Sequence, residues 1–229
     1  MSTDSHRVFG RRPAVRDVLE HPLLGLDPRR TAIAVGYLAV LGGLFAVSYA
    51  GTAITIDGAA LETLTPRFDT VSTVLIALAT ATIAIVPFLY AAWNGGPVLS
   101  FAMPLVPVAF GTLATGQYVL GLDAAIALTV GGAASTLALF ATGVRRTGSL
   151  RPWRTADLDG THLLVVTMLA VVAAVSVGRF VAGSPPRNLE WYAPFAALWL
   201  VPVAVVGVYW QAAMRTAIAT RTERPDSEP

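Results

Sequence analysis

The chain contains no cysteine and no lysine, so its sixteen basic residues are all arginine. Without cysteine it can form neither disulfides nor thiolate metal sites, and without lysine it cannot hold retinal as a Schiff base. Charged side chains are also scarce, at 13% of the 229 residues, against 55% hydrophobic residues. The absence of lysine beside abundant alanine, valine and arginine is typical of a GC-rich prokaryotic genome. Little of the chain is left for a soluble domain.

What the chain does contain is a series of long uncharged runs. A membrane core about 30 Å thick needs roughly 20 apolar residues to cross it as a helix. The run between Asp69 and Asp123 is too long for one crossing. The segment Asn94-Gly95-Gly96-Pro97 divides it, because two glycines and a proline cannot cheaply continue a helix. The sequence therefore predicts an all-α integral membrane protein, a bundle of about six transmembrane helices at 31–56, 70–93, 98–118, 124–144, 163–181 and 191–214.

Arginine positions predict which way the chain faces. Thirteen of the sixteen arginines fall before the first span, between the fourth and fifth, or after the sixth, and only Arg67, Arg179 and Arg187 fall on the other side. Because arginine-rich short connections stay in the cytoplasm, we expect both termini there and the chain in the cell membrane. Residues 1–30 then form a cytoplasmic arm, residues 31–214 the transmembrane domain, and residues 215–229 a disordered cytoplasmic tail.

The cytoplasmic arm carries an amphipathic pattern. Apolar residues from Val15 to Leu23 recur at helical spacing, and Arg11, Arg12 and Arg16 lie toward the other face. We interpret the segment as an interfacial helix whose arginines contact anionic lipid, at about 1 kcal/mol each. The alternative is a solvated lead-in to the first span. The calculated pI of 9.3 follows from such flanks and does not indicate nucleic-acid binding, which needs a folded domain to present a basic groove.

One motif resembles a catalytic signature. Asp157-Leu158-Asp159-Gly160-Thr161 matches the DxDGT pattern of haloacid-dehalogenase-type phosphatases, in which the first aspartate is the nucleophile. That chemistry needs a hydrophobic strand leading into the motif, whereas Arg151-Pro152-Trp153-Arg154 precedes it here. We therefore interpret the motif as a solvated turn in which Asp157 or Asp159 caps the fifth helix, with His162 as an interfacial neighbour.

The predicted spans hold no ionisable side chain near their centres. Intramembrane Asp, Glu, Lys, Arg or His normally marks proton relays and ion pathways, because little else offsets their desolvation cost. This argues against a proton-coupled antiporter and a zinc-dependent intramembrane protease. We expect no enzyme activity, no cofactor and no metal site. Any enzyme would have to place its groups at the cytoplasmic interface, where His6, His21, Asp157, Asp159 and His162 form no familiar constellation.

The spans are instead rich in small residues and prolines. Gly42, Ala46 and Ala50 form a small-residue row on the first span, and Gly131 and Gly132 begin similar rows on the fourth, an arrangement that lets helices pack closely. Prolines free carbonyls that can line a polar cavity, although spans also tolerate them without function. The candidate cavity-lining residues are Asn94, Pro104, Pro107, Gln117, Tyr118, Ser135, Thr136 and Pro202. Pro104 and Pro107 also leave open whether the third span is complete or re-entrant.

Two functional hypotheses follow. Leu105-Val106-Pro107-Val108-Ala109 recurs as Leu200-Val201-Pro202-Val203-Ala204, a weak sign of a 3+3 inverted repeat like that of many secondary transporters. The first hypothesis is accordingly a small-solute transporter or permease subunit without intramembrane proton-coupling residues. The alternative is a non-catalytic membrane anchor, scaffold or accessory subunit of a complex, which contacts the lipid bilayer and a protein partner at its cytoplasmic face.

Overall fold

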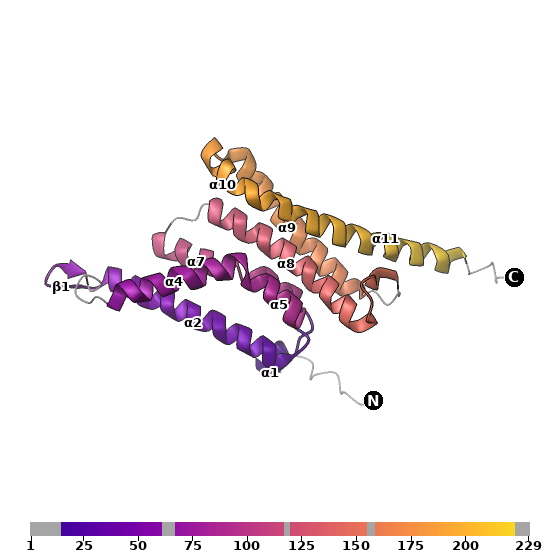
Figure 1. The fold of residues 1–229 in the computed structure, drawn as a ribbon, viewed down its shortest axis with the longest axis horizontal. Coiled ribbons are helices and arrows are strands. Elements are labelled where there is room, and N and C mark those ends of the chain that lie inside the picture. Colours follow the sequence, from indigo (N-terminus) through magenta and orange to yellow (C-terminus); the bar gives the residue numbers. More distant parts are fainter. Residues whose placement is uncertain (1–14, 61–66, 117–119, 155–158, 223–229) are drawn as a thin grey trace, which may run out of the picture.

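The computed structural model describes residues 15–60, 67–116, 120–154 and 159–222, which are nearly all helical (Figure 1). A minimal hairpin pairs β1 (Thr55–Ile56) with β2 (Ala59–Ala60), and Asp57-Gly58 supplies the positive φ angles of its turn. The helical elements are α1 (Val15–Leu19), α2 (Pro28–Ala53), α4 (Arg67–Ala84), α5 (Val86–Asn94), α6 (Pro97–Ala102), α7 (Leu105–Thr115), α8 (Leu122–Thr147), η1 (Pro152–Arg154), α9 (Gly160–Gly183), α10 (Pro186–Ala196), η2 (Ala197–Trp199) and α11 (Leu200–Thr222).

Within the described residues, five helical segments are long and apolar enough to cross a membrane, and a sixth is added if the bent pair α4–α5 counts as one span. Each predicted span has a counterpart: α2, α4–α5, α6–α7, α8, α9 and α10–α11. The predicted all-helical class is confirmed, and the five or six membrane-type segments compare with the six that were predicted. The first helix begins earlier than expected because the Asp27 side chain caps it, accepting the Arg29 N–H at 2.8 Å, and Pro28 occupies its first position.

The sharpest break lies in the second membrane-type segment, and not in the third, where Pro104 and Pro107 suggested one. α4 and α5 meet at 54° around Ile85, whose backbone leaves the helical region, and Pro87 sits in the first turn of the restarted helix. Proline lacks an N–H and is therefore compatible with a first turn but not with a continuing helix. The third segment, Pro97–Ala114, is long and apolar enough to cross as one unit despite Pro104 and Pro107.

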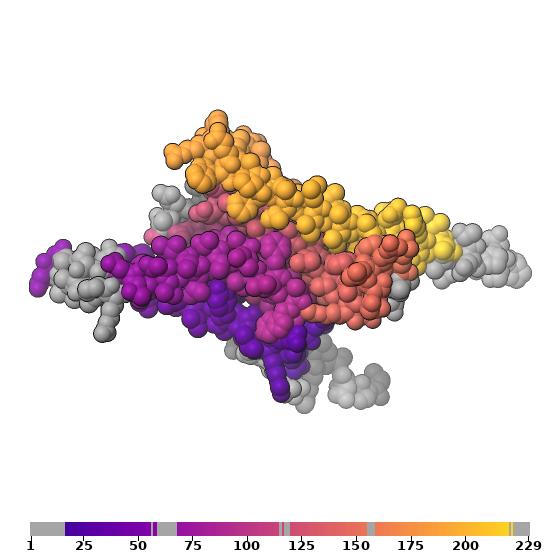
Figure 2. Space-filling model, in the orientation of Figure 1, coloured from indigo at the N-terminus to yellow at the C-terminus, as the bar shows by residue number. Residues whose placement is uncertain are grey.

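The centre of the bundle is α8. It contacts α4, α5, α6 and α7 on one side and α9, α10 and α11 on the other, and it lies between those two groups in Figure 1. Of its most apolar stretch, 72% of the residues are buried, against 22% for α2. In the space-filling view α4, α5 and α11 hide most of α8, and its C-terminal end reaches the surface with η1 (Figure 2).

Small residues on α8 permit this central position. A Cβ atom added to Gly131 would lie 2.7 Å from the carbonyl oxygen of Phe101, so the backbone of α6 passes directly over it. Beside it, a Cβ on Gly132 would meet its nearest neighbour, Ala173 of α9, at an ordinary 3.6 Å. Within a lipid solvent such close approach, and not the hydrophobic effect, drives helix association.

The predicted small-residue row on the first span is only partly an interface. Gly42 is buried against the ring of Phe110 on α7, and Ala50 is half-buried, but Ala46 is exposed. The expectation that Ala46 faces a neighbouring helix is therefore wrong. The next buried residue of α2 is Gly51, whose Cβ position falls against Phe68 of α4. Gly51 lies nine residues after Gly42, about 180° around a helix of 3.6 residues per turn, so α2 contacts α7 and α4 on opposite faces.

Candidate functional site

The segment before α2 docks onto the break between α5 and α6. Leu26 donates its N–H to the carbonyl oxygen of Asn94 at 2.9 Å, and Val98 donates to the carbonyl oxygen of Leu23 at 3.1 Å. The approach is close enough to require glycine, since a Cβ on Gly96 would lie 1.7 Å from the Leu24 carbonyl oxygen. The segment that leads into α2 thus packs against the Asn-Gly-Gly-Pro break through backbone hydrogen bonds.

Asn94 is the centre of a fully paired cluster that we call the Asn94 clamp, made with Leu24, Asp27, Thr31 and Tyr90. The Tyr90 hydroxyl donates to the Leu24 carbonyl at 2.5 Å, and the Thr31 hydroxyl donates to the Asp27 carbonyl at 3.1 Å. Both hydroxyl oxygens therefore accept, and the two N–H bonds of the Asn94 amide reach them at 2.9 Å each. The Asn94 side-chain oxygen accepts the Asp27 N–H at 2.9 Å.

Both N–H groups and the oxygen of the Asn94 amide have hydrogen-bond partners within the clamp. Asn94 and Thr31 are 0% exposed. A buried polar group left without a partner costs about 1–3 kcal/mol, so the network joins α2 to α5 only while it is complete. Asn94 was predicted as a cavity-lining residue, and the structure places it inside this clamp, together with Thr31 and Tyr90, which the sequence reasoning did not single out.

Arginines gather around the same place, which we call the arginine-rich end. Arg30 donates to the carbonyl oxygen of Trp93 at 2.6 Å, and its guanidinium carbon lies 5.2 Å from the centre of the Trp93 ring. Arg145 of α8 donates to the carbonyl oxygen of Ala92. Both cations thus cap the negative end of the α5 dipole. Asp27 lies 3.6 Å from Arg30.

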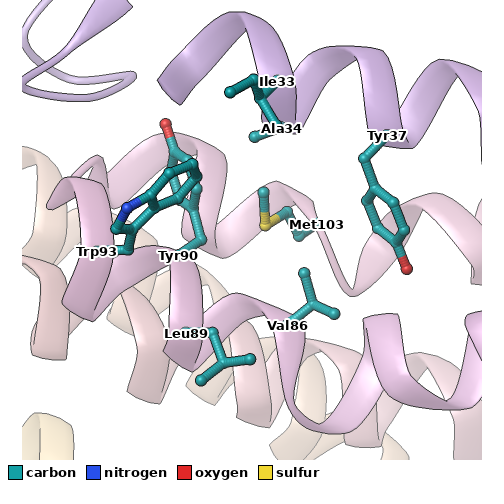
Figure 3. A pocket seen from close by; sticks show the side chains of 8 residues that line it. All are labelled: Ile33, Ala34, Tyr37, Val86, Leu89, Tyr90, Trp93 and Met103. Carbon is teal, nitrogen blue, oxygen red and sulfur yellow. The ribbon is translucent and has the colours of Figure 1, made fainter. Parts of the chain in front are cut away.

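A groove of about 520 Å³ opens beside the clamp between α2 and α5 (Figure 3). Apart from the hydroxyls of its two tyrosines and the ring N–H of Trp93, its lining side chains are hydrocarbon or thioether: Ile33, Ala34, Tyr37, Val86, Leu89, Tyr90, Trp93 and Met103. Tyr37 closes the end farthest from Trp93, where its hydroxyl contacts that of Thr82 on α4 at 2.6 Å. The sequence signal for this groove was Pro87, since the break in helix direction before it separates α5 from α2.

A second pocket of about 580 Å³ lies near the opposite end of the bundle. Its lining includes the predicted Pro107 together with Phe45, Gly111, Gly121 and Asp123. Asp123 occupies the first turn of α8 and is exposed, and it places a carboxylate at the edge of an otherwise mostly apolar hollow.

Among the described residues, the other predicted site residues do not meet around one cavity. Ser135 and Thr136 are 0% exposed, and their hydroxyls donate to the carbonyls of Gly132 and Ala133 in their own helix, at 2.9 and 2.7 Å. Pro104 and Pro202 are buried, at the start of α7 and in the first turn of α11. Gln117, Tyr118, Arg11 and Arg12 lie outside the described residues, and α1 includes Arg16, whose side chain is not described.

The DxDGT segment ends as a helix cap. Asp159 accepts the N–H groups of Thr161 and His162 at 3.1 and 3.2 Å and begins α9, as predicted, while Asp157 lies outside the described residues. The second carboxylate oxygen of Asp159 contacts His162 Nδ1 at 2.5 Å. Burial raises the pKa of the Asp159 carboxyl, but the hydrogen bonds and charge of His162 and the N–H of Thr161 together hold that pKa below its ordinary 3.8.

His162 itself is 6% exposed, and its Nε2 atom is one of two buried side-chain polar atoms without a hydrogen-bond partner in the described part of the chain, the other being the Tyr209 hydroxyl. Across the same described residues, no three His, Cys, Asp or Glu side chains stand where they could hold a metal ion. The carboxylate and imidazole therefore form a capping pair beside Arg146, which lies 3.9 Å from Asp159.

The fold and these sites define an all-helical protein with several membrane-type segments and an arginine-rich end. No protein-family model, curated protein or solved structure matches the chain significantly.

Proposed function

We propose that this protein is a non-catalytic scaffold or accessory subunit of a membrane complex, a multi-pass protein of the cell membrane with both termini in the cytoplasm. The orientation is supported by the arginine distribution and by the gathering of Arg30 and Arg145 at the end that also carries the Asn94 clamp. On this orientation the η1 loop and the segment entering α2 face the cytoplasm.

The packing of α8 is the observation that favours a scaffold over a transporter. A transport path needs polar groups free to replace the hydration of a solute. On α8 the hydroxyls of Ser135 and Thr136 are fully buried and bonded within the helix, and Thr129 bonds Ala125 and the Tyr192 hydroxyl, each at 2.8 Å. The other buried residues of α8 are mostly glycine and alanine, with Leu128, Val130, Leu139 and Thr142 among them. Each of the three hydroxyls of Thr129, Ser135 and Thr136 is buried and donates its proton to a carbonyl of its own helix, so none of these protons is available to a solute.

A surface for a partner is supported by the loop after α8. Leu150 is 76% exposed, outside any membrane-type helix, and Arg151 and Arg154 follow it. An exposed apolar side chain next to arginines can contribute to a protein–protein contact, where arginine is enriched. The adjacent Trp153 is anchored by ring contacts with Phe140 and Tyr209 at 6.4 Å, so the loop presents Leu150 from a fixed base.

Single-cysteine labelling tests the proposal, because the chain has no native cysteine to contribute background. A membrane-impermeant maleimide added to intact cells should label Arg187→Cys and spare Leu150→Cys until the cells are opened, which tests orientation. Ser135→Cys and Thr136→Cys should resist labelling from either side. Aqueous labelling of either α8 position in folded protein would contradict the solid bundle and favour a transport path.

A crosslinking experiment tests the partner surface. A photoreactive probe attached to Leu150→Cys should give one discrete heterologous protein adduct, whereas the same probe on Val175→Cys, 61% exposed on α9, should give lipid adducts only. Adducts limited to lipid at both positions would contradict the scaffold role at this loop.

Transport is the second candidate, favoured by the pocket that contains Pro107 and Asp123. The 3+3 inverted repeat stays a prediction, and the two helices it would pair, α2 and α8, differ in burial. If this pocket is an external vestibule, Asp123→Cys and Ala124→Cys should both label from outside, and labelling should continue inward to Gly111→Cys. Labelling at Asp123→Cys without labelling at Gly111→Cys would contradict a transport path through this pocket and favour the scaffold.

A further inference from the structure

The apolar groove between α2 and α5 has the dimensions of a ligand site and opens toward the lipid-facing surface. Its volume of about 520 Å³ lies within the roughly 300–1,000 Å³ typical of small-molecule sites. Ile33 and Leu89 form its two rims and are 61% and 62% exposed. In a membrane these rims contact hydrocarbon, so an acyl chain can enter sideways without crossing a polar barrier. Ala34 and Met103 are buried and form its floor, which is visible in Figure 3.

The groove ends at a positively charged mouth. Trp93 lines that end, and Arg30 lies over its ring at 5.2 Å. Arg29 is exposed and has no ion pair within the described residues, and Arg145 binds the carbonyl next to that of Trp93. Asp27, 3.6 Å from Arg30, offsets part of this charge. Arginine has five N–H donors, and Arg30 keeps donors beyond those used on Trp93 and Asp27.

We propose that this groove binds one phospholipid with an anionic headgroup, with an acyl chain between α2 and α5 and the phosphate at Arg29 and Arg30. The arginines at the mouth complement the negative charge of the headgroup, and the apolar lining of the groove accommodates the acyl chain next to it. Tyr37, held against Thr82, limits how deeply the chain penetrates. The site depends on the break before Pro87, since a straight α4–α5 helix would not leave this gap.

Native mass spectrometry of delipidated protein tests the site, with phosphatidylglycerol and phosphatidylcholine of identical chains as probes. Phosphatidylglycerol should bind the unmodified protein at least fivefold more tightly than phosphatidylcholine. Ile33→Trp fills the groove from an exposed rim and should weaken both lipids at least fivefold. Arg29→Gln should weaken phosphatidylglycerol about fivefold, the effect of one interfacial cation, and leave phosphatidylcholine unchanged.

Two matched variants serve as controls. Val40→Trp adds the same ring at a position of α2 that is 64% exposed and does not line the groove, and Arg215→Gln removes an exposed arginine from α11. Both should bind lipid like the unmodified protein. If Ile33→Trp destabilises the fold, Leu89→Trp on the opposite rim replaces it. Equal binding of the two lipids, or unchanged binding when either rim is filled, would overturn the proposal and assign the lipid to the general annulus.

Discussion

Replacing Gly131 by alanine should separate α6 from α8, and Gly132→Ala is the natural control because the two glycines are neighbours on the same helix. The added methyl group at Gly131 would stand 2.7 Å from the Phe101 carbonyl oxygen, a backbone atom that cannot rotate away. At Gly132 the new Cβ would have its nearest contact at 3.6 Å, with the Ala173 methyl group. Both changes replace glycine in the interior of α8, so they differ mainly in the space available.

The expected magnitudes follow from two opposed terms. Alanine stabilises a helix interior by up to about 1 kcal/mol relative to glycine, and this gain is shared by both variants. Overpacking a close contact costs about 1–3 kcal/mol, and this cost applies to Gly131→Ala alone. The difference in unfolding free energy between the variants should therefore be about 1–3 kcal/mol, with Gly132→Ala at or above the unmodified protein and Gly131→Ala below Gly132→Ala by that amount.

Thermal unfolding in a mild detergent, followed by the fluorescence of the native tryptophans, measures this difference. At roughly 2–4 °C per kcal/mol for a chain of this size, the two variants should melt several degrees apart. A Gly178→Ala variant, on an exposed part of α9 with open space at its Cβ position, reports the helix-propensity gain alone. Equal melting of Gly131→Ala and Gly132→Ala would refute the close α6–α8 contact.

Three further predictions concern other positions. Asn94→Ala should lower the unfolding free energy by about 1–3 kcal/mol, because it leaves the Asp27 N–H without its acceptor. Asn94→Asp should restore little of this loss, since a carboxylate cannot donate to Thr31 and Tyr90. If chemical denaturation finds both variants as stable as the unmodified protein, the clamp is excluded. Asp159→Ala should cost about 1 kcal/mol as a lost N-cap. Because the Asp159 pKa is lowered in the folded state, ionised Asp159 contributes to stability above the ordinary pKa of 3.8, and this contribution is lost as the pH falls through the lower folded pKa. Asp159→Ala should therefore remove part of the loss of stability at acid pH. An unchanged dependence of stability on pH in the acid range would contradict this. Ala46→Leu should change stability by less than about 0.5 kcal/mol, as surface substitutions do, and a large loss would mean that Ala46 contacts another helix after all.

The span positions were predictable because the bilayer imposes a length and composition that are visible along the chain. The breaks at Asn94-Gly95-Gly96-Pro97 and the cap at Asp159 were equally local, since glycine, proline and aspartate act on their own backbone neighbourhood. Side-chain roles were less accessible. Asn94 looked like a cavity residue because a polar amide in a long apolar run suggests exposure to solute, and only its distance from Asp27 and Thr31 revealed a saturated network.

The sequence by itself determined the class of protein, the approximate limits of its helices and the sorting of arginines between the two ends. These properties come from interactions of each segment with lipid, water and the membrane interface, which a segment has wherever its neighbours lie. The tertiary structure alone decided that α8 is the central helix, that Gly131 and not Ala46 is a close contact, and that Pro87 opens a groove ending at Trp93 and Arg30. Those outcomes depend on which helices meet and at what angle, and residues such as Arg30 and Trp93, far apart along the chain, acquire a common role only when packing brings them together.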